Sequence, residues 1–475
     1  MSILTQHPQL TVLQQLARQR KVKVYLVGGF LRDRLLERPC LDFDFAVGKG
    51  AVALARAFAR KVKGAFVLLD AEHGCGRVVK KDNGRILTFD FADFRKSTLR
   101  GDLRHRDFTV NTLCADIAGL DSGVSLDVKD ALGGLKDIKA RVIRMTGPGV
   151  FQEDPLRIMR AYSLQAQLGF KIERATAAQI KKDRELIRVP AAERIREELF
   201  KIFESPRAAA ALRALDRAGL LERVIPQITV MYGVRQGTYH HLDVWPHSLE
   251  TVAQVEKVFE EYASDPDVSA YLAEPLGGAH SRRAVIKLAA LLHDVGKPQT
   301  RRNEPGGRIS FHGHENVGRA ITRHAAKQLK ISTKERYALE DMVRMHLRPG
   351  YLSNFKRPSD KAVFRYFRDA GDEAAAILLL SLADQRSTCG PATTAADQKH
   401  HDTICRGLLK SWFARKKEKP VVRLISGHDL IKKLKLKPSP LFAQILGAVE
   451  EQQAVGKITS AHEALEMARK IAEKK

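Results

Sequence analysis

Two aspartates, Asp42 and Asp44, are the first residues in this sequence whose type and spacing suit catalysis. They lie in the segment 41–47 and alternate there with the apolar Phe43 and Phe45, the pattern of a strand that buries one face. Carboxylates at positions i and i+2 of a strand point the same way and can hold one or two divalent cations. Hard oxygen ligands suit Mg²⁺, so the segment predicts a magnesium site that also binds phosphate.

The residues before this strand are suited to hold that phosphate. A buried strand at 23–27 is predicted to end in Gly28-Gly29, and helical spacing follows in FLRDRLLE. A glycine turn lets the backbone approach a phosphate, and Arg32, early in the helix, can reach it as a fork-shaped donor. These parts suit phosphoryl or nucleotidyl transfer, in which metal ions activate a hydroxyl and stabilise the reacting phosphate. Asp90, on a second alternating segment, is a candidate third catalytic carboxylate.

A second set of residues has the composition of a transition-metal site. His293 and Asp294 end an apolar helix in KLAALLHDVGKPQT. Imidazoles combined with carboxylates favour Mn²⁺, Ni²⁺, Zn²⁺ or Fe²⁺ over Mg²⁺, and a metal held in this way supports phosphoester hydrolysis. The candidate ligands are His247, His293, Asp294 and Asp384, with His314 and His346 as further candidates.

The spacing of apolar residues predicts how these sites are supported. Strand-like alternation is confined to the first part of the chain, and beyond residue 145 apolar positions recur every three or four residues, as in helices. Polar intervals rich in glycine and proline, at 264–280 and 300–313, are predicted to interrupt the helices. The stretch 406–437 is rich in lysine and arginine, and the last forty residues have the spacing of two short helices.

Composition narrows the class of protein. The 475 residues include 81 lysines and arginines against 55 aspartates and glutamates, a net charge of +26 that favours a polyanionic partner, nucleic acid before membrane. No stretch approaches the ~18 consecutive apolar residues of a membrane span, and the first residues lack the pattern of a signal peptide. We therefore expect a cytoplasmic protein without a membrane partner. The five scattered cysteines argue against a disulfide framework and against a cysteine zinc site.

Several motifs, in order along the chain, resemble one family. The run YLVGGFLRDRLLERPCLDFDFAV (residues 25–47) resembles the signature motif of class II tRNA nucleotidyltransferases and bacterial poly(A) polymerases, members of the DNA polymerase β-like superfamily. RHRDFTVNTL (104–113) resembles the Arg-Arg-Asp-Phe-Thr-Ile-Asn motif of the family, with His105 in place of the first arginine of that pair. Residues 130–144, 153–170 and 191–203 resemble the segment that closes the head, the neck motif and the helix after it.

The resemblance implies a role for each matching residue. Asp42 and Asp44 would hold the catalytic Mg²⁺, with Asp90 as the third carboxylate. Asp154 and Arg157 would act as a protein template that pairs with the edge of C or A. Ser163 stands where many members carry an arginine. The residues expected to bind the nucleotide are Gly28, Gly29, Arg32, Arg106, Asp107, Asp154, Arg157 and Arg160.

The histidine set resembles the HD phosphohydrolase superfamily, and the C-terminal segment resembles the tail of many tRNA enzymes. The expected fold class is α+β: a polymerase-β-like α/β nucleotidyltransferase head followed by an all-α body. The expected domains are the catalytic head (1–145), a helical neck that carries the template (146–228), an HD domain (229–400) and a basic, RNA-binding helical tail (401–475). Its lysines would contact RNA phosphates.

The expected function is therefore template-independent addition of C, A or both, from CTP and ATP, to the 3′ ends of tRNA. Family members that build the whole CCA end usually carry a long flexible loop before the Arg-Asp motif, and here only residues 95–103 separate that motif from the preceding strand. This shortening resembles the CC-adding subtype, with an A-adding enzyme as the alternative. Poly(A) polymerase is the nearest rival. The other readings are an HD phosphohydrolase that acts on RNA ends or nucleotides, and a non-catalytic RNA-binding protein.

Overall fold

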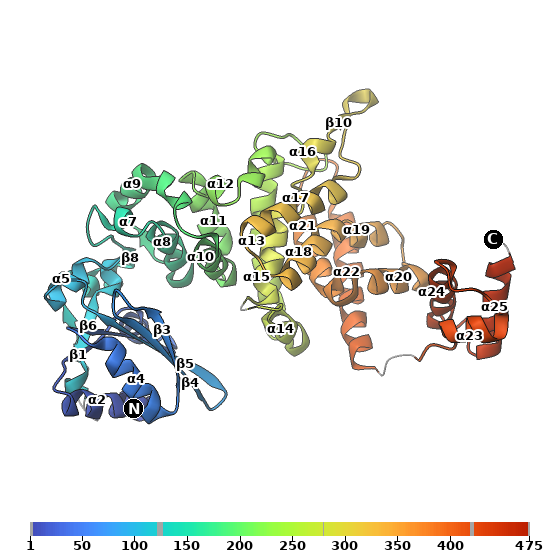
Figure 1. The fold of residues 1–475 in the computed structure, drawn as a ribbon. Coiled ribbons are helices and arrows are strands. Elements are labelled where there is room, and N and C mark those ends of the chain that lie inside the picture. Colours follow the sequence, from blue (N-terminus) through green and yellow to red (C-terminus); the bar gives the residue numbers. More distant parts are fainter. Residues whose placement is uncertain (1–2, 121–126, 279, 419–421, 474–475) are drawn as a thin grey trace. The chain divides into compact units, whose positions relative to one another are not determined.

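The computed structural model of the protein describes residues 3–120, 127–278, 280–418 and 422–473 (Figure 1). The chain divides into two compact units, one formed by residues 1–191 with 218–220 and the other by 192–217 with 221–475. The expected fold class is confirmed, because a mixed sheet occupies the first unit and helices dominate the second. The domain boundaries predicted after residues 145, 228 and 400 stay predictions.

A seven-stranded sheet forms the centre of the first unit, in the order β3-β4-β5-β2-β1-β6-β7. Neighbouring strands are antiparallel except β2 and β5, which are parallel. The strands are β1 (Val24–Val27), β2 (Asp42–Val47), β3 (Ala65–Asp70), β4 (Cys75–Asp82), β5 (Arg85–Asp93), β6 (Leu113–Asp116) and β7 (Lys129–Asp130), with the separate pair β8 (Val142–Ile143) and β9 (Lys171–Ile172). The helices are α1 (Ile3–Gln6), α2 (Pro8–Gln19), α3 (Gly29–Leu35), α4 (Ala51–Val62), α5 (Leu99–Arg104), α6 (Gly134–Ala140), α7 (Val150–Glu153), α8 (Arg157–Leu168) and α9 (Arg174–Asp183).

Stacked phenylalanines hold the strands of the site against the helices. Phe43 of β2 stacks on Phe89 of β5 and on Phe30 of α3, with ring centroids 4.9 Å and 4.5 Å apart. Phe58 of α4 meets Phe89 edge to face. All four rings are buried, so the apolar face of β2 is fixed and its carboxylates must point to the other face.

The short segment before the Arg-Asp motif is ordered differently from the expected loop. Residues 99–104 form helix α5, and the Thr98 hydroxyl caps it by accepting a hydrogen bond from the Gly101 amide at 3.1 Å. Asp102 accepts a hydrogen bond from the Arg95 amide at 3.0 Å and so ties the start of the segment to its helix. These hydrogen bonds therefore fix residues 95–103, the braced segment, between β5 and the motif.

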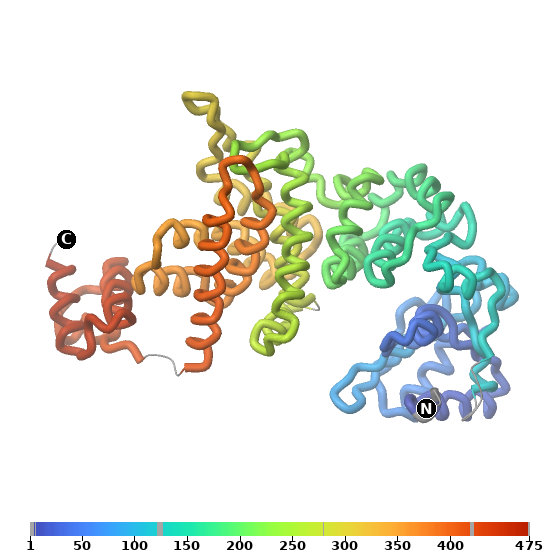
Figure 2. The backbone as a smooth tube through the Cα atoms, turned by 180° about the vertical axis from the view of Figure 1, so that it is seen from behind, coloured from blue at the N-terminus to red at the C-terminus, as the bar shows by residue number. Residues whose placement is uncertain are grey.

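The second unit is a helical body arranged around the apolar helix α21, which packs against α13, α15, α18 and α22. Figure 2 shows the long α22 lying along one side of the unit. Its helices are α10 (Ala192–Glu204), α11 (Ala208–Arg217), α12 (Leu221–Val224), α13 (Val244–Glu261), α14 (Pro266–Ala273), α15 (Arg282–Leu292), α16 (Lys297–Thr300), α17 (His314–Gln328), α18 (Thr333–Met345), α19 (Arg348–Ser353), α20 (Asp360–Ala370), α21 (Ala374–Ser387), α22 (Ala395–Lys417), α23 (Gly427–Leu434), α24 (Leu441–Ala454) and α25 (Ala461–Glu473).

Both polar intervals predicted from the sequence contain regular structure. The interval 264–280 contains α14, because the Asp265 side chain accepts from the amides of the first turn and Pro266 occupies the first helical position. The interval 300–313 contains a small hairpin of β10 (Arg302–Asn303) and β11 (Ile309–Ser310), which projects from the rest of the unit (Figures 1 and 2). Composition alone did not reveal these caps and pairings.

The C-terminal segment has a small apolar core of its own. Ile425, Leu430, Ile445 and Val449 are buried there against residues of α25. The two helices predicted for the last forty residues are confirmed as α24 and α25, while residues 419–421 of the basic stretch and 474–475 lie outside the described residues. Within the described ranges, no helix is both long and apolar enough to span a bilayer, and all five cysteines are unpaired.

Replacing Phe89 by alanine should lower the free energy of unfolding by about 3–5 kcal/mol, because it removes a fully buried ring that contacts Phe43 and Phe58. Ile86→Ala, on the same strand but 55% exposed, is the control and should change stability by less than about 0.5 kcal/mol. Calorimetric melting of the full chain measures both variants. Equal losses from the two would contradict a core centred on these rings.

Candidate active site and metal centre

The pairing of β1 with β2 places the glycine turn over one of the predicted catalytic carboxylates. Val27, the last residue of β1, lies opposite Asp44. A Cβ on Gly28 would lie 2.8 Å from Asp44 Oδ2, and the φ of Gly28 is +82°. Both the backbone angle and the space therefore require glycine at this position.

Asp90 lies next to Asp44, as the sequence predicts for a third carboxylate. In the parallel pair of β2 and β5, Asp44 is in register with Asp90. Arg77 of β4 binds Asp90 in a fork, with Nε–Oδ1 and Nη2–Oδ2 distances of 2.8 Å and 2.7 Å. Asp90 therefore also holds the Arg77 side chain on the sheet.

The carboxylates on β2 differ in burial. Asp42 is exposed at the start of the strand, whereas burial raises the pKa of Asp44 and the nearby Asp90 and Asp42 add to this rise, against the opposing charge of Arg106. A cation beside Asp44 would relieve the repulsion among these carboxylates. The donor set therefore fits a hard divalent cation that keeps water and substrate oxygens as its other ligands.

Arg32 lies beside the glycine turn but already has protein partners. Its Nη1 donates to Asn111 Oδ1 at 2.5 Å, and its Nη2 lies 2.7 Å from Asp33 Oδ2. A Cβ on Gly29 would lie 3.3 Å from the guanidinium. The turn, Arg32 and the Arg-Asp motif thus form one connected group.

Asp107 links the Arg-Asp motif to α8, the helix of the neck motif. Its buried carboxylate accepts from the Phe108 amide at 2.8 Å and from Asn111 Nδ2 at 3.0 Å, and Arg160 Nε of α8 lies 2.8 Å away. Burial alone would raise the pKa of Asp107, but the Arg160 charge and these hydrogen bonds outweigh it, so the pKa is lowered. The Nε of Arg106, the other member of the Arg-Asp pair, lies 3.6 Å from Asp102 Oδ2.

The predicted template residues lie at the break between α7 and α8. Asp154 Oδ1 accepts from the Leu156 amide at 3.2 Å. Arg157 is buried, and its donors reach Val150 O at 3.1 Å, Glu153 Oε2 at 3.2 Å and His105 O at 2.6 Å. The Nδ1 of His105 lies 2.8 Å from Glu153 Oε1.

The second unit gathers all six predicted HD residues. His247 is on α13, His293 and Asp294 follow α15, His314 begins α17, His346 follows α18, and Asp384 is on α21. Among the residues described, two groups have ligand atoms within 4.8 Å of one another: His247, His293 and Asp384 in one, and Asp294, His314 and His346 in the other.

Asp294, a member of the second group, also faces the histidines of the first. Its Oδ2 lies 3.2 Å from His293 Nε2 and 3.5 Å from His247 Nε2, while its Oδ1 lies 3.4 Å from His314 Nε2 and 3.8 Å from His346 Nε2. One carboxylate therefore faces both sets of imidazoles, the arrangement of a bridging ligand.

The protonation of this centre also fits a metal. His293 Nε2 is buried without a hydrogen bond in the described part of the chain. Burial alone would lower the pKa of His293, but the Asp294 and Asp384 carboxylates raise it to about 10. Burial and the nearby His293 and His314 lower the pKa of His346 to about 3. A bound cation would take the place of the proton on His293, because metal ligation requires neutral imidazole.

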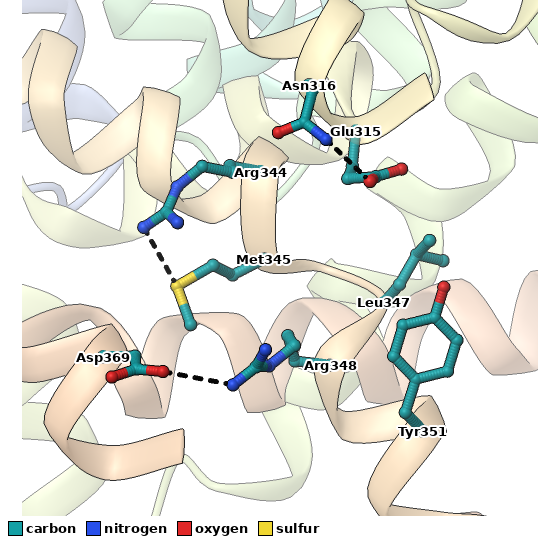
Figure 3. A pocket seen from close by; sticks show the side chains of 8 residues that line it. All are labelled: Glu315, Asn316, Arg344, Met345, Leu347, Arg348, Tyr351 and Asp369. Atoms are coloured by element: carbon teal, nitrogen blue, oxygen red, sulfur yellow. Dashed lines mark hydrogen bonds and ion pairs between the residues drawn. The ribbon is translucent and has the colours of Figure 1, made fainter. Parts of the chain in front are cut away.

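A pocket of about 260 Å³ lies where α17, α18, α19 and α20 meet (Figure 3). Arg348 faces Asp369 at 3.2 Å, and Arg344 reaches the sulfur of Met345 at 3.4 Å. Two arginines and two acids line the pocket, so no net charge selects an anion there. The lining residues are Glu315, Asn316, Arg344, Met345, Leu347, Arg348, Tyr351 and Asp369.

Family models match three parts of the chain: the poly A polymerase head domain at 24–144, a probable RNA and SrmB- binding site of polymerase A at 169–231, and the HD domain at 244–389. The A-adding tRNA nucleotidyltransferase of Deinococcus radiodurans is 33% identical over 94% of this chain and 95% of its own length. The chain belongs to the tRNA nucleotidyltransferase family.

Other relatives agree with this assignment. The CC-adding tRNA nucleotidyltransferase of Thermus thermophilus is 30% identical over 92% of this chain and 91% of its own. The Thermotoga maritima CCA-adding enzyme complexed with tRNA has the same fold, with a TM-score of 0.62 and 21% identity over 98% of this chain and 95% of its own. The sequence-based recognition of the family is thus confirmed.

Two residues of this nucleotidyltransferase were missed from the sequence. Asn111 bridges Arg32 and Asp107, and its place in the motif RHRDFTVNTL was the available signal. Lys297 Nζ lies 2.7 Å from Asp294 Oδ2 and donates to Gln236 Oε1 at 2.6 Å. Its position three residues after Asp294 gave no chemical signal by itself.

Replacing Gly28 by alanine should lower nucleotide addition about hundredfold, because the added methyl group displaces Asp44 and strains the turn. Gly48→Ala is the matched control, since a Cβ on Gly48 meets no atom within 4 Å. Single-turnover extension of tRNA measures both variants. Full activity in Gly28→Ala would contradict the close approach of the turn to Asp44.

Proposed function

We propose that this tRNA nucleotidyltransferase adds the two cytidines of the CCA end to tRNA, using CTP and Mg²⁺. The proposal rests on the close approach of the Gly28 turn to Asp44, with Asp90 in register beside it. In the proposed reaction the terminal ribose hydroxyl of tRNA bonds to the α-phosphorus of CTP, the α–β phosphoanhydride bond breaks, and pyrophosphate leaves. Mg²⁺ held by Asp42 and Asp44 would supply charge neutralisation and activation of the hydroxyl.

The residues around the carboxylates would bind and orient the nucleotide. Gly28 and Gly29 keep side chains away from the turn, so backbone can approach the triphosphate. Arg32 and Arg106 supply positive charge beside it. Asp107, held by Asn111 and Arg160, is proposed to face the nucleotide sugar.

The braced segment 95–103 supports the CC-adding subtype. The hydrogen bonds of Thr98 and Asp102 fix α5 in place of a long flexible loop. A site that keeps one conformation reads one kind of base, because switching from C to A requires the base-reading residues to move. The relatives include both A-adding and CC-adding enzymes, so their names do not choose between C and A, and the CC-adding proposal rests on the shortened segment.

The basic C-terminal segment is proposed to bind tRNA phosphates. Lys432, Lys435 and Lys437 are exposed on and just after α23. Such contacts are independent of sequence and weaken as the salt concentration rises. They would hold the tRNA while successive nucleotides are added.

An extension assay tests the proposed function directly. With tRNA lacking its CCA end, Mg²⁺ and both nucleotides, we expect addition to stop after two cytidines, and Asp44→Asn should abolish it. Asp116→Asn, on β6 of the same sheet, is the control that should stay active. Completion to CCA would contradict the CC-adding proposal, and long A-tails on unrelated RNA would indicate a poly(A) polymerase.

The HD centre is a candidate for a second activity, phosphoester hydrolysis at RNA ends or on nucleotides. The observation that favours this activity is the pair of three-residue ligand groups, in which Asp294 of one group also faces the histidines of the other. Mn²⁺, Ni²⁺, Zn²⁺ or Fe²⁺ suit these ligands, and such a cation would polarise a phosphoryl oxygen and activate water.

Calorimetric titration of the metal-free full chain with Mn²⁺ should give two bound ions, one for each ligand group. His293→Ala should remove one ion and His314→Ala the other, while His428→Ala, an exposed histidine on α23, should leave both. A stoichiometry of zero or one in the unmodified protein would contradict the two-ion centre.

A further inference from the structure

His105, which stands where the family usually has an arginine, contacts the segment that carries the template residues. Arg157 is taken as the arginine that reads the base, the role that the family resemblance implies for it, and the inference rests on the proposed function. His105 occupies the position before the Arg-Asp pair of the head motif, and Glu153 ends α7, just before the template residues.

The Glu153 carboxylate joins the two residues. Its Oε1 lies 2.8 Å from Nδ1 of His105, and its Oε2 accepts from Arg157 Nη1 at 3.2 Å. The same histidine also holds the arginine through its backbone, because Arg157 Nη2 donates to His105 O at 2.6 Å. The carbonyl of Val150 takes a further bond from Nη1 at 3.1 Å.

These bonds determine which part of the guanidinium can face a ligand. Arginine has five N–H donors in a rigid plane, and three of them are directed to Glu153, Val150 and His105. The donors that remain are the one on Nε and the second one on Nη2. A planar group held at three points cannot turn to suit a different base.

Burial strengthens this restraint. The Arg157 side chain is 6% exposed, whereas His105 and Glu153 are 31% and 39% exposed at the edge of the site. The outer pair thus shields and orients the inner arginine. Two donors fixed in one plane match the adjacent N3 and O2 acceptors on the pairing edge of cytosine, while the pairing edge of adenine offers the single acceptor N1.

We propose that His105 and Glu153 are positioning residues that fix the Arg157 guanidinium, and that this fixed orientation makes the site prefer CTP to ATP. Arg157 contacts the base, and the other two residues act through it. Loosening the contact frees the guanidinium to turn, so discrimination falls while the reacting phosphate is untouched.

The test compares variants of the full-length protein. His105→Ala and Glu153→Leu should each lower the ratio of kcat/KM for CTP to that for ATP about tenfold, through a higher KM for CTP with little change in kcat. His105→Arg keeps a donor toward Glu153 and should retain the ratio. His73→Ala is the matched control, since His73 makes the same kind of contact with Asp70, at 2.9 Å, on an exposed turn of the head.

A double variant tests whether the two residues act as one unit. His105→Ala combined with Glu153→Leu should lower the ratio no further than Glu153→Leu alone. An unchanged ratio in Glu153→Leu, or losses that multiply in the double variant, would overturn the proposal. Leucine is close to glutamate in size and cannot accept a hydrogen bond, so Glu153→Leu decides the question even where His105→Ala melts early.

Binding separates this proposal from the proposed function. CTP and ATP affinities of the protein without tRNA, measured by calorimetry, should show the same tenfold loss of preference in Glu153→Leu. A protein that extends no tRNA yet loses this preference would refute the CC-adding function and keep the positioning role. Normal CC addition with an unchanged preference would do the reverse.

Discussion

The register between β1, β2 and β5 is the constraint on which the nucleotidyl-transfer site depends. It brings Val27 opposite Asp44 and Asp44 beside Asp90, so the turn after β1 and both carboxylates meet at one place. A shift of one residue would turn the carboxylates of β2 into the phenylalanine core, because side chains alternate along a strand. The stacked Phe30, Phe43 and Phe89 oppose such a shift. Apolar packing on one face of the sheet therefore keeps the carboxylates on the other face.

A second set of contacts connects this sheet to the helices that follow it. Asp107 meets Arg160, and His105 meets both Glu153 and Arg157. The motif that completes the head and the motif that begins the neck are therefore parts of one polar network. The effects of substitutions in the two segments are expected to be non-additive, since partners in a shared network do not act independently.

Much of this arrangement could be predicted from the sequence. The alternation around Asp42 and Asp44 and the glycine turn sufficed for the strand, the turn and the adjacent helix, because each has a local signature. The partners of Asp90 and Arg157 could not be predicted, since Arg77, Val150 and His105 are brought in by strand pairing and helix packing. The interval 264–280 separates α13 from α15 as predicted, but the helix inside it could not be predicted from composition, because one capping aspartate starts it.

The wide separation of the HD ligands along the chain has a consequence for synthesis. His247 and Asp384 are in contact across 137 residues, and the six ligands come from five separate segments of the helical unit, since only His293 and Asp294 are adjacent. Closing so long a loop is slow, and domains emerge from the ribosome in N-terminal to C-terminal order. The head can therefore complete its fold while the helical unit is still being made. Until α21 has been translated, His247 and His293 lack the Asp384 carboxylate, which lies 3.0 Å and 3.5 Å from their Nε2 atoms in the folded unit.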